Sequence, residues 1–179
     1  MATEQETNPT AQVTETAMEA PAVDMTEARL QEARAIVRHN VKWAAGIGIL
    51  PIPLVDFVGI TTIQLRMLKK LGALYDIPFF DHTVKNLLSS LLVGMGSMRL
   101  GASLAGGLVK MLPGVGTLLG LTVLPTVAGA LTHATGNVFI AHFESGGNFL
   151  DFKPEAVRAH FRSEFEAAQE RLKNQGNQA

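Results

Sequence analysis

The sequence predicts an all-α protein, in which a glycine-rich apolar helical hairpin is flanked by amphipathic helices within one domain. Apolar residues recur every three or four positions in three separate segments, which is the period of a helix with one buried face. Of the 179 residues, 47% are hydrophobic and only 17% are charged, whereas charged residues make up roughly 25% of an average soluble domain. Charge is almost absent between residues 86 and 143, where only Arg99 and Lys110 carry one.

Composition excludes several classes of protein. A formal net charge of −1 disfavours a nucleic-acid partner, because nucleic-acid-binding domains are usually markedly basic. The few aromatic residues are not interleaved with a basic stretch that could stack on bases. Cysteine is absent, which excludes disulfide bonds and cysteine metal sites.

The two ends of the chain are expected to lie outside the domain. Residues 1–23 are rich in Thr, Ala and Glu and precede the first basic residue, Arg29. They lack the basic and apolar regions of a secretory signal, and their composition is typical of a disordered acidic tail. We therefore expect the domain over residues 24–174 and a second disordered end over residues 175–179.

A first amphipathic helix is predicted from about Asp24. Its apolar stripe comprises Leu30, Ala33, Val37, Val41 and Ala44. Arg34, Arg38 and Lys42 recur every four residues on a neighbouring face and are followed by Trp43. A basic row that ends in Trp is typical of a helix lying on an anionic membrane surface, and equally of any solvated helix face.

The stretch GILPIPLVDF, residues 48–57, predicts a break and then a second helix. Glycines and the prolines Pro51 and Pro53 interrupt the first helix, and proline suits the first turn of a helix over residues 53–75. Asp56 falls in that first turn, where a carboxylate meets free backbone N–H groups. An ion pair with Arg99 or Lys110 is the alternative role, and no second acid, base or nucleophile converges on it for catalysis.

The second helix has one apolar and one polar side. Its stripe comprises Asp56, Ile60, Ile63, Gln64, Met67, Leu71 and Leu74, and its polar side carries Arg66, Lys69 and Lys70. Asp76 and the following IPFFD segment are expected to end it, and Asp81 to cap the next helix.

Residues 86–143 are predicted to form the apolar hairpin, with arms over 86–109 and 117–140 and a turn at PGVG, residues 113–116. Ten of the seventeen glycines lie between residues 94 and 136, and Gly116 begins a GxxxG. Small residues share one face of the first arm, which lets helices approach closely in lipid: Ser90, Gly94, Ser97, Gly101 and Ala105. The second arm is long enough to cross a bilayer, whereas the first would carry Arg99 near its middle. A soluble, glycine-rich helix pair is the alternative.

The last predicted helix begins at Pro154, with Glu155 in its first turn, and ends before Gly176. Its apolar stripe comprises Val157, Phe161, Phe165, Ala168 and Leu172. Its other faces are charged. We expect this helix to pack on the first helix or to lie on a membrane surface.

No pattern in the sequence indicates an enzyme or a cofactor. Gly101 and Gly106 have P-loop spacing, but Gly107 stands where the phosphate-binding lysine is needed. The five histidines form neither an HxxxH nor an HExxH pair, so no metal site is predicted. A GxSxG nucleophile elbow is also missing.

Three stretches resemble the YcjF-like bacterial family, a domain of unknown function that occurs alone or attached to GTPase domains. They are ILPIPLVDFVGITTIQLRMLKKLGALY, LLVGMGSMRLGASLAGGLVKMLPGVGTLLG and AGALTHATGNVFIAHFESGG, within residues 40–147. The residues on the family's pattern are Pro51, Pro53, Asp56, Gln64, Tyr75, Lys110, Pro113, Gly114 and Gly116. The resemblance implies membrane association, an unestablished activity and, by analogy, a separate GTPase partner.

These patterns together predict a non-enzymatic, membrane-associated helical protein that binds lipid and serves as an anchor or adaptor for a GTPase or another cytoplasmic partner. The basic residues flank the base of the hairpin, which predicts an inner-membrane location with both termini in the cytoplasm. The small-residue face predicts homo-oligomers. Two alternatives remain at this stage: a soluble helical interaction module, and a pore component lined by Arg99 and the histidines.

Overall fold

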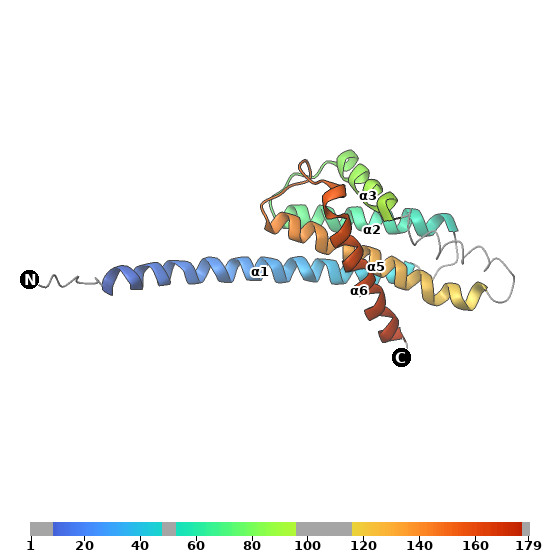
Figure 1. The fold of residues 1–179 in the computed structure, drawn as a ribbon, viewed down its shortest axis with the longest axis horizontal. Coiled ribbons are helices and arrows are strands. Elements are labelled where there is room, and N and C mark those ends of the chain that lie inside the picture. Colours follow the sequence, from blue (N-terminus) through green and yellow to red (C-terminus); the bar gives the residue numbers. More distant parts are fainter. Residues whose placement is uncertain (1–8, 48–52, 96–115, 177–179) are drawn as a thin grey trace, which may run out of the picture. The chain divides into compact units, whose positions relative to one another are not determined.

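The computed structural model describes residues 9–47, 53–95 and 116–176 of the chain. These ranges form five helices and no strand, which confirms the predicted all-α class (Figure 1). The helices are α1 (Pro9–Ile47), α2 (Pro53–Leu74), α3 (Asp81–Met95), α5 (Gly116–Glu144) and α6 (Pro154–Gly176). The chain divides into two compact units, Met1–Glu32 and Ala33–Ala179.

Helix α1 begins at Pro9 rather than near Asp24, so residues 9–23 of the expected tail are helical. Proline is favoured at a first helical position, and the Ala, Glu and Gln that follow are good helix formers. From Ala33 onward α1 belongs to the second unit, where Ala33, Val37 and Ala44 are buried. The predicted apolar stripe of this helix is confirmed there.

Helix α2 runs from Pro53 to Leu74, within one residue of the predicted range. Asp76 ends it with a positive φ of 56°, and the Ile77 N–H donates to the carbonyl of Gly72 at 2.8 Å. This is a Schellman end, in which a left-handed residue lets the chain turn back and satisfy the last carbonyls. The prediction that Asp76 ends the helix is therefore confirmed.

The predicted hairpin is described in two pieces. Helix α3 extends from Asp81, the expected cap position, to Met95 and includes Ser90 and Gly94 of the small-residue face. The rest of that face, at Ser97, Gly101 and Ala105, lies outside the described residues. Helix α5 continues through Pro125 to Glu144, so the helical second arm is confirmed.

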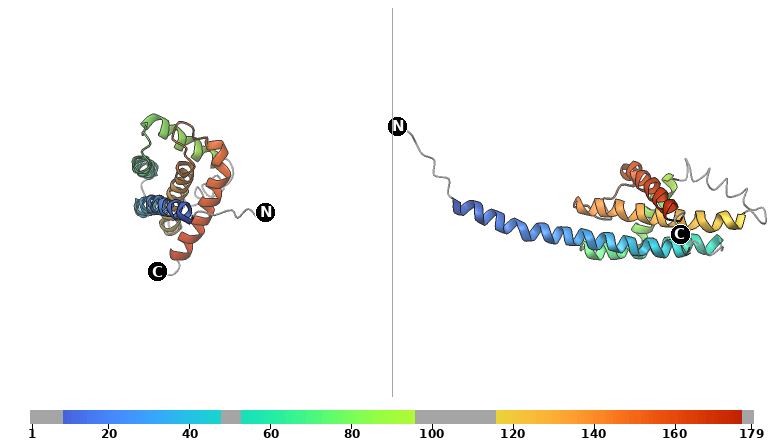
Figure 2. Two further views of the ribbon diagram at one scale, coloured as in Figure 1. Left: turned by 90° about the vertical axis from the view of Figure 1, so that its left-hand side faces the viewer. Right: turned by 90° about the horizontal axis from the view of Figure 1, so that it is seen from below.

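Helix α5 is central to the second unit. Helices α2 and α6 pack on opposite sides of it (Figure 2), and α3 contacts both α2 and α6. Helix α1 approaches α5 closely at Gly136, where an added Cβ would lie 2.4 Å from a methyl group of Val37. Glycines of the second arm thus provide close helix contacts within the chain.

The core is richest in aromatic residues where α5 ends. Phe139 stacks on Phe152 with ring centroids 4.2 Å apart, and Phe143 meets Phe149 edge-on at 5.1 Å. All four rings are at most 5% exposed. The α6 stripe is also confirmed, because Phe161, Phe165 and Ala168 are buried.

Candidate functional site: a basic groove between α2 and α3

The residues proposed from sequence do not converge on one site among those described. Pro53 and Asp56 lie in the first turn of α2 and Gly116 begins α5, as expected. Gln64 lies on the buried side of α2, and Tyr75 lies just beyond the end of that helix. The remaining candidates lie outside the described residues: Pro51, Arg99, Lys110, Pro113 and Gly114. The cap and ion-pair roles of Asp56 both stay predictions.

Tyr75 connects the ends of two helices. Its hydroxyl donates to Oε1 of Glu144, at the end of α5, at a distance of 2.5 Å. Its ring packs on Phe143 with centroids 5.5 Å apart. A phenol bonded to a carboxylate is a strong, charge-assisted contact, so Tyr75 serves to hold α2 against α5.

Gln64 is a buried polar side chain of a different kind. It is 0% exposed, and neither its amide nitrogen nor its amide oxygen has a hydrogen-bond partner in the described structure. The Thr135 hydroxyl, on α5, is buried and unpartnered as well. Such groups cost roughly 1–3 kcal/mol each in lost hydration, so Gln64 does not stabilise the described part of the fold through hydrogen bonds.

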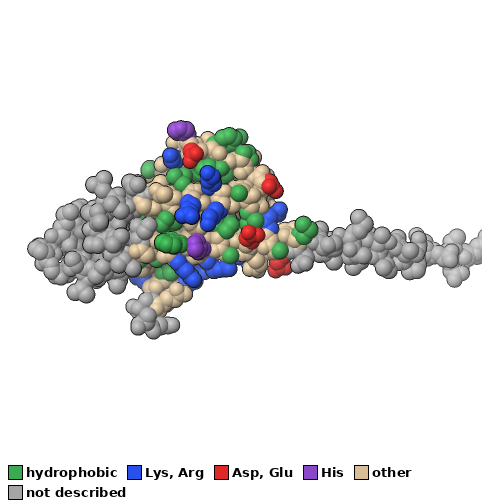
Figure 3. Space-filling model, turned by 180° about the vertical axis from the view of Figure 1, so that it is seen from behind, with side chains coloured by type: hydrophobic (Ala, Val, Ile, Leu, Met, Phe, Trp, Pro, Cys, Tyr) green, Lys and Arg blue, Asp and Glu red, His purple; other side chains and the backbone are tan. Residues whose placement is uncertain are grey.

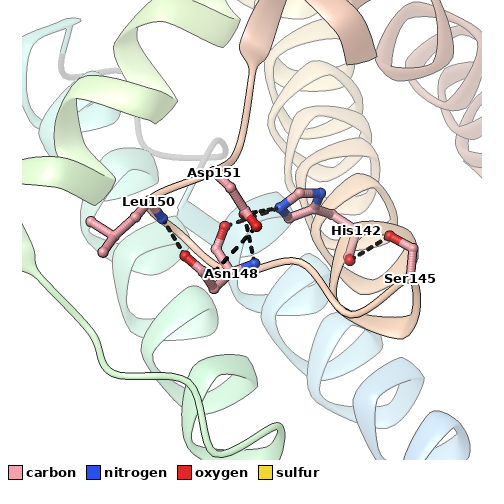
Figure 4. Close-up of polar contacts among 5 residues, drawn as sticks. All are labelled: His142, Ser145, Asn148, Leu150 and Asp151. Carbon is pink, nitrogen blue, oxygen red and sulfur yellow. Dashed lines mark hydrogen bonds and ion pairs between the residues drawn. The ribbon is translucent and has the colours of Figure 1, made fainter.

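The loop after α5 holds a histidine–aspartate pair (Figure 4). His142 Nε2 lies 2.9 Å from Asp151 Oδ1 and 3.0 Å from the carbonyl of Asn148. Both partners are acceptors, so Nε2 carries the proton. The Asn148 N–H donates to the same carboxylate at 2.7 Å. This bond first, and the His142 bond second, hold the pKa of Asp151 below its usual range.

That pair resembles part of a catalytic triad, but its geometry is that of a loop brace. The Ser145 hydroxyl donates to the backbone carbonyl of His142 at 2.7 Å and not to the ring, so the ring does not activate it as a nucleophile. Gly146 has a φ of 84°, and the Gly147 N–H donates to the His142 carbonyl. The contacts together form a second Schellman end, closed by the Asp151 side chain.

The groove between α2 and α3 is the candidate binding site of the described structure. It is a cavity of about 650 Å³ whose walls carry Arg66 and Lys69 from α2 and Lys85 from α3. All three side chains are exposed, and none forms an ion pair or hydrogen bond with a described residue. Figure 3 shows Lys and Arg side chains gathered on this face, over α2 and α3.

Part of the groove lining is apolar. Leu65 and Phe79 line it, and Phe79 is held edge-on against Phe149 at 5.6 Å. The adjacent Phe80 is 44% exposed. Asp81 is the one carboxylate among the lining residues and opens α3. Cations and apolar side chains that line one groove suit a ligand that is both anionic and amphiphilic.

The basic row of α1 is exposed, as the sequence predicts. Arg34, Arg38 and Lys42 face solvent. Trp43 is 61% exposed, and its indole N–H donates to Nε2 of His39, one turn earlier, at 3.0 Å. Sequence reasoning found this row and the α2 cations, but it missed Lys85 and the groove.

The described residues show neither a metal-ligand cluster nor a membrane-spanning helix. No group of three potential metal ligands occurs within the described ranges. Among those same residues, none of the helices combines the length and the apolar character required for a bilayer crossing. The crossing that the sequence predicts for residues 117–140, within α5, is not supported by the described structure.

Comparison with known proteins places this all-helical chain in a family. Residues 14–170 match the model of a domain of unknown function (DUF697), and the chain belongs to that family. It is 37% identical over 134 residues to "Magnetosome membrane protein 22" of Magnetospirillum gryphiswaldense, an overlap that spans 75% of this chain and 69% of the relative. No solved structure matches. The narrower YcjF-like assignment is carried by neither match and stays a resemblance.

Proposed function

We propose that this protein is a non-enzymatic, membrane-associated helical protein. It binds anionic lipid through the exposed cations of α1 and α2 and anchors a cytoplasmic partner. The observation that carries the proposal is the set of exposed cations on a chain whose net charge is only −1. On α1 they stand beside Trp43, which is 61% exposed. Basic residues beside an exposed indole favour the interface of an anionic membrane.

The family relation supports the same proposal. A relative that is 37% identical over most of both chains is named a membrane protein. The YcjF-like resemblance adds a GTPase as the cytoplasmic partner and the bacterial inner membrane as the location. Both termini would then lie in the cytoplasm, with residues of the hairpin entering the bilayer and its small-residue face pairing copies of the chain.

Flotation with lipid vesicles tests membrane association. The protein is expected to float with vesicles that contain phosphatidylglycerol and not with pure phosphatidylcholine vesicles. A variant with Arg34→Gln, Arg38→Gln, Lys42→Gln and Trp43→Ala should float less. Three substitutions in and just before α6 change the charge equally and serve as the control: Lys153→Gln, Arg158→Gln and Lys173→Gln. Equal recovery with both kinds of vesicle would overturn the electrostatic part.

Carbonate extraction of native membranes tests the insertion of the hairpin. Retention in the membrane pellet at high pH is expected, and complete release without detergent would show that the protein does not insert.

Cross-linking in intact membranes, followed by extraction in mild detergent and mass spectrometry, tests the identity of the partner. A GTPase is expected to be enriched over an Arg66→Glu and Lys70→Glu variant, and its absence would remove the adaptor role.

A further inference from the structure

We propose that the groove between α2 and α3 binds the phosphate monoester head group of a lipid, held by Arg66, Lys69 and Lys85. This inference rests on the proposed membrane association and specifies the ligand for one surface of it. The three cations line one cavity from two different helices. In the described structure they have no anionic partner of their own.

The charge of the groove fits a phosphate monoester. Three cations and the Asp81 carboxylate leave a formal charge of about +2. A phosphate monoester carries roughly −1.5 to −2 at neutral pH, so the two charges nearly cancel. A phosphodiester head group carries about −1, which leaves one cation unmatched. The groove should therefore distinguish lipids by the form of their phosphate as well as by total surface charge.

The position of α3 adds to the attraction for an anion. Asp81 is both a lining residue and the first residue of α3, so the N-terminal end of that helix lies at the groove. Free N–H groups in a first turn favour a bound phosphate. The Asp81 side chain opposes this effect, because its negative charge stands beside the incoming anion.

The size and lining of the groove favour a lipid over a small phosphate. About 650 Å³ is far more than a phosphate ion fills and is typical of sites for drug-sized ligands. Leu65 and Phe79 line the apolar part, where a glycerol backbone and the start of an acyl chain would lie. Phe80, next in the chain, is 44% exposed and is placed to enter the bilayer surface beside the bound head group.

The test compares vesicles of equal surface charge that contain either phosphatidic acid or phosphatidylglycerol. The full-length protein is expected to bind the phosphatidic acid vesicles more tightly. Replacing Arg66, Lys69 and Lys85 by Gln should weaken that binding by roughly 100-fold, since each cation contributes about 1 kcal/mol near an anionic surface. The control variant, with Lys153, Arg158 and Lys173 changed to Gln, should retain the preference.

A gain of affinity guards against loss of folding. Asp81→Asn removes the opposing charge and should tighten binding to phosphatidic acid several-fold, which an unfolded variant cannot do. Equal affinity for the two lipids, or a preference that survives the groove substitutions, would overturn the head-group site while leaving membrane association intact. Failure of the wild-type protein to bind either vesicle would overturn both proposals.

The lipid source is tested separately with a soluble competitor. Glycerol 3-phosphate carries the same phosphate monoester without acyl chains. It is expected to displace the protein from phosphatidic acid vesicles only at concentrations far above the lipid concentration. Displacement at equal concentration would overturn the lipid assignment and identify a small phosphorylated metabolite as the ligand.

Discussion

The contact between α5 and α6 and the contact between α2 and α3 are both formed by two helices, but they differ in how completely they are packed. Phe139 of α5 and Phe161 of α6 are completely buried, and Asn137 of α5 donates to Glu164 of α6 at 2.5 Å. Between α2 and α3, a cavity of about 650 Å³ stays open beside exposed cations. One contact is filled and internally satisfied, and the other leaves charge and apolar surface without partners.

This difference separates stability from binding within one small domain. Close packing removes apolar surface from water and so contributes most of the folding free energy. An open groove contributes little, because water still reaches both of its walls. Helix α2 contributes to both the core and the groove. Its inner side buries Met67 and Leu71, while its outer side presents Arg66 and Lys69 to the groove.

The largest expected effect is at the centre of the filled region. Phe139→Ala should lower the free energy of unfolding by about 3–5 kcal/mol, because its ring is 0% exposed and contacts three other phenylalanines. Phe80→Ala is the matched change beside the groove, where the ring is 44% exposed, and should cost less than about 1 kcal/mol. Chemical denaturation measures both. Similar losses at the two positions would contradict the comparison.

The second effect tests how closely the helices approach. Gly136→Ala should destabilise by about 1–3 kcal/mol, because overpacking forces neighbouring groups to shift. The added Cβ would lie 2.4 and 2.8 Å from the two methyl groups of Val37. Gly46→Ala, with nothing within 4 Å, should be neutral or stabilise by up to about 1 kcal/mol. Thermal unfolding of the two variants measures the difference in stability. A neutral Gly136→Ala would show that α1 does not pack closely there.

Sequence alone could predict the helices that have local signals. Pro53 and Pro154 begin α2 and α6 as expected, because proline at a first turn is a short-range determinant. The α6 stripe at Phe161 and Phe165 follows from helical period alone and is buried. The predicted start of α1 was wrong. Residues 9–23 lack an apolar stripe, although the Ala, Glu and Gln among them are good helix formers.

The groove could be predicted only in part. The sequence places Arg66 and Lys69 on the polar side of α2, but Lys85 joins them only through the way in which α2 and α3 cross. That geometry depends on distant contacts, such as Phe149 against the backbone at Gly72, where an added Cβ would lie 3.1 Å from the ring. The loop from Ser145 to Lys153 was missed because it has no period. Its Gly–Gly–Asn run, followed by Asp151, was the available signal.

A third and smaller effect concerns the inner side of α2. Gln64→Met keeps the volume and removes two buried polar atoms that lack partners. It should raise the free energy of unfolding by about 1 kcal/mol, because an unsatisfied amide loses its hydration on burial. Leu65→Met, at a half-buried groove position, is the control for adding a methionine to this helix. A loss of stability in Gln64→Met would show that the amide has a partner outside the described residues.

The smallest effect is expected at the loop brace, which lies at the edge of the filled region. The bonds from the Asn148 N–H and from His142 lower the pKa of Asp151, so the folded state binds this proton less readily than the unfolded chain. Its contribution to stability is therefore complete above the unfolded pKa of about 3.9 and is lost as the pH falls through the lower folded value.

Asp151→Asn should unfold at a slightly lower temperature than wild type at pH 7. The difference should shrink below about pH 4, because wild type loses the same charge there. Melting temperatures from pH 7 down to pH 2 measure this convergence. A difference that stays constant over that range would mean that the carboxylate acts through its shape and hydrogen bonds, as an asparagine also could, and not through its charge.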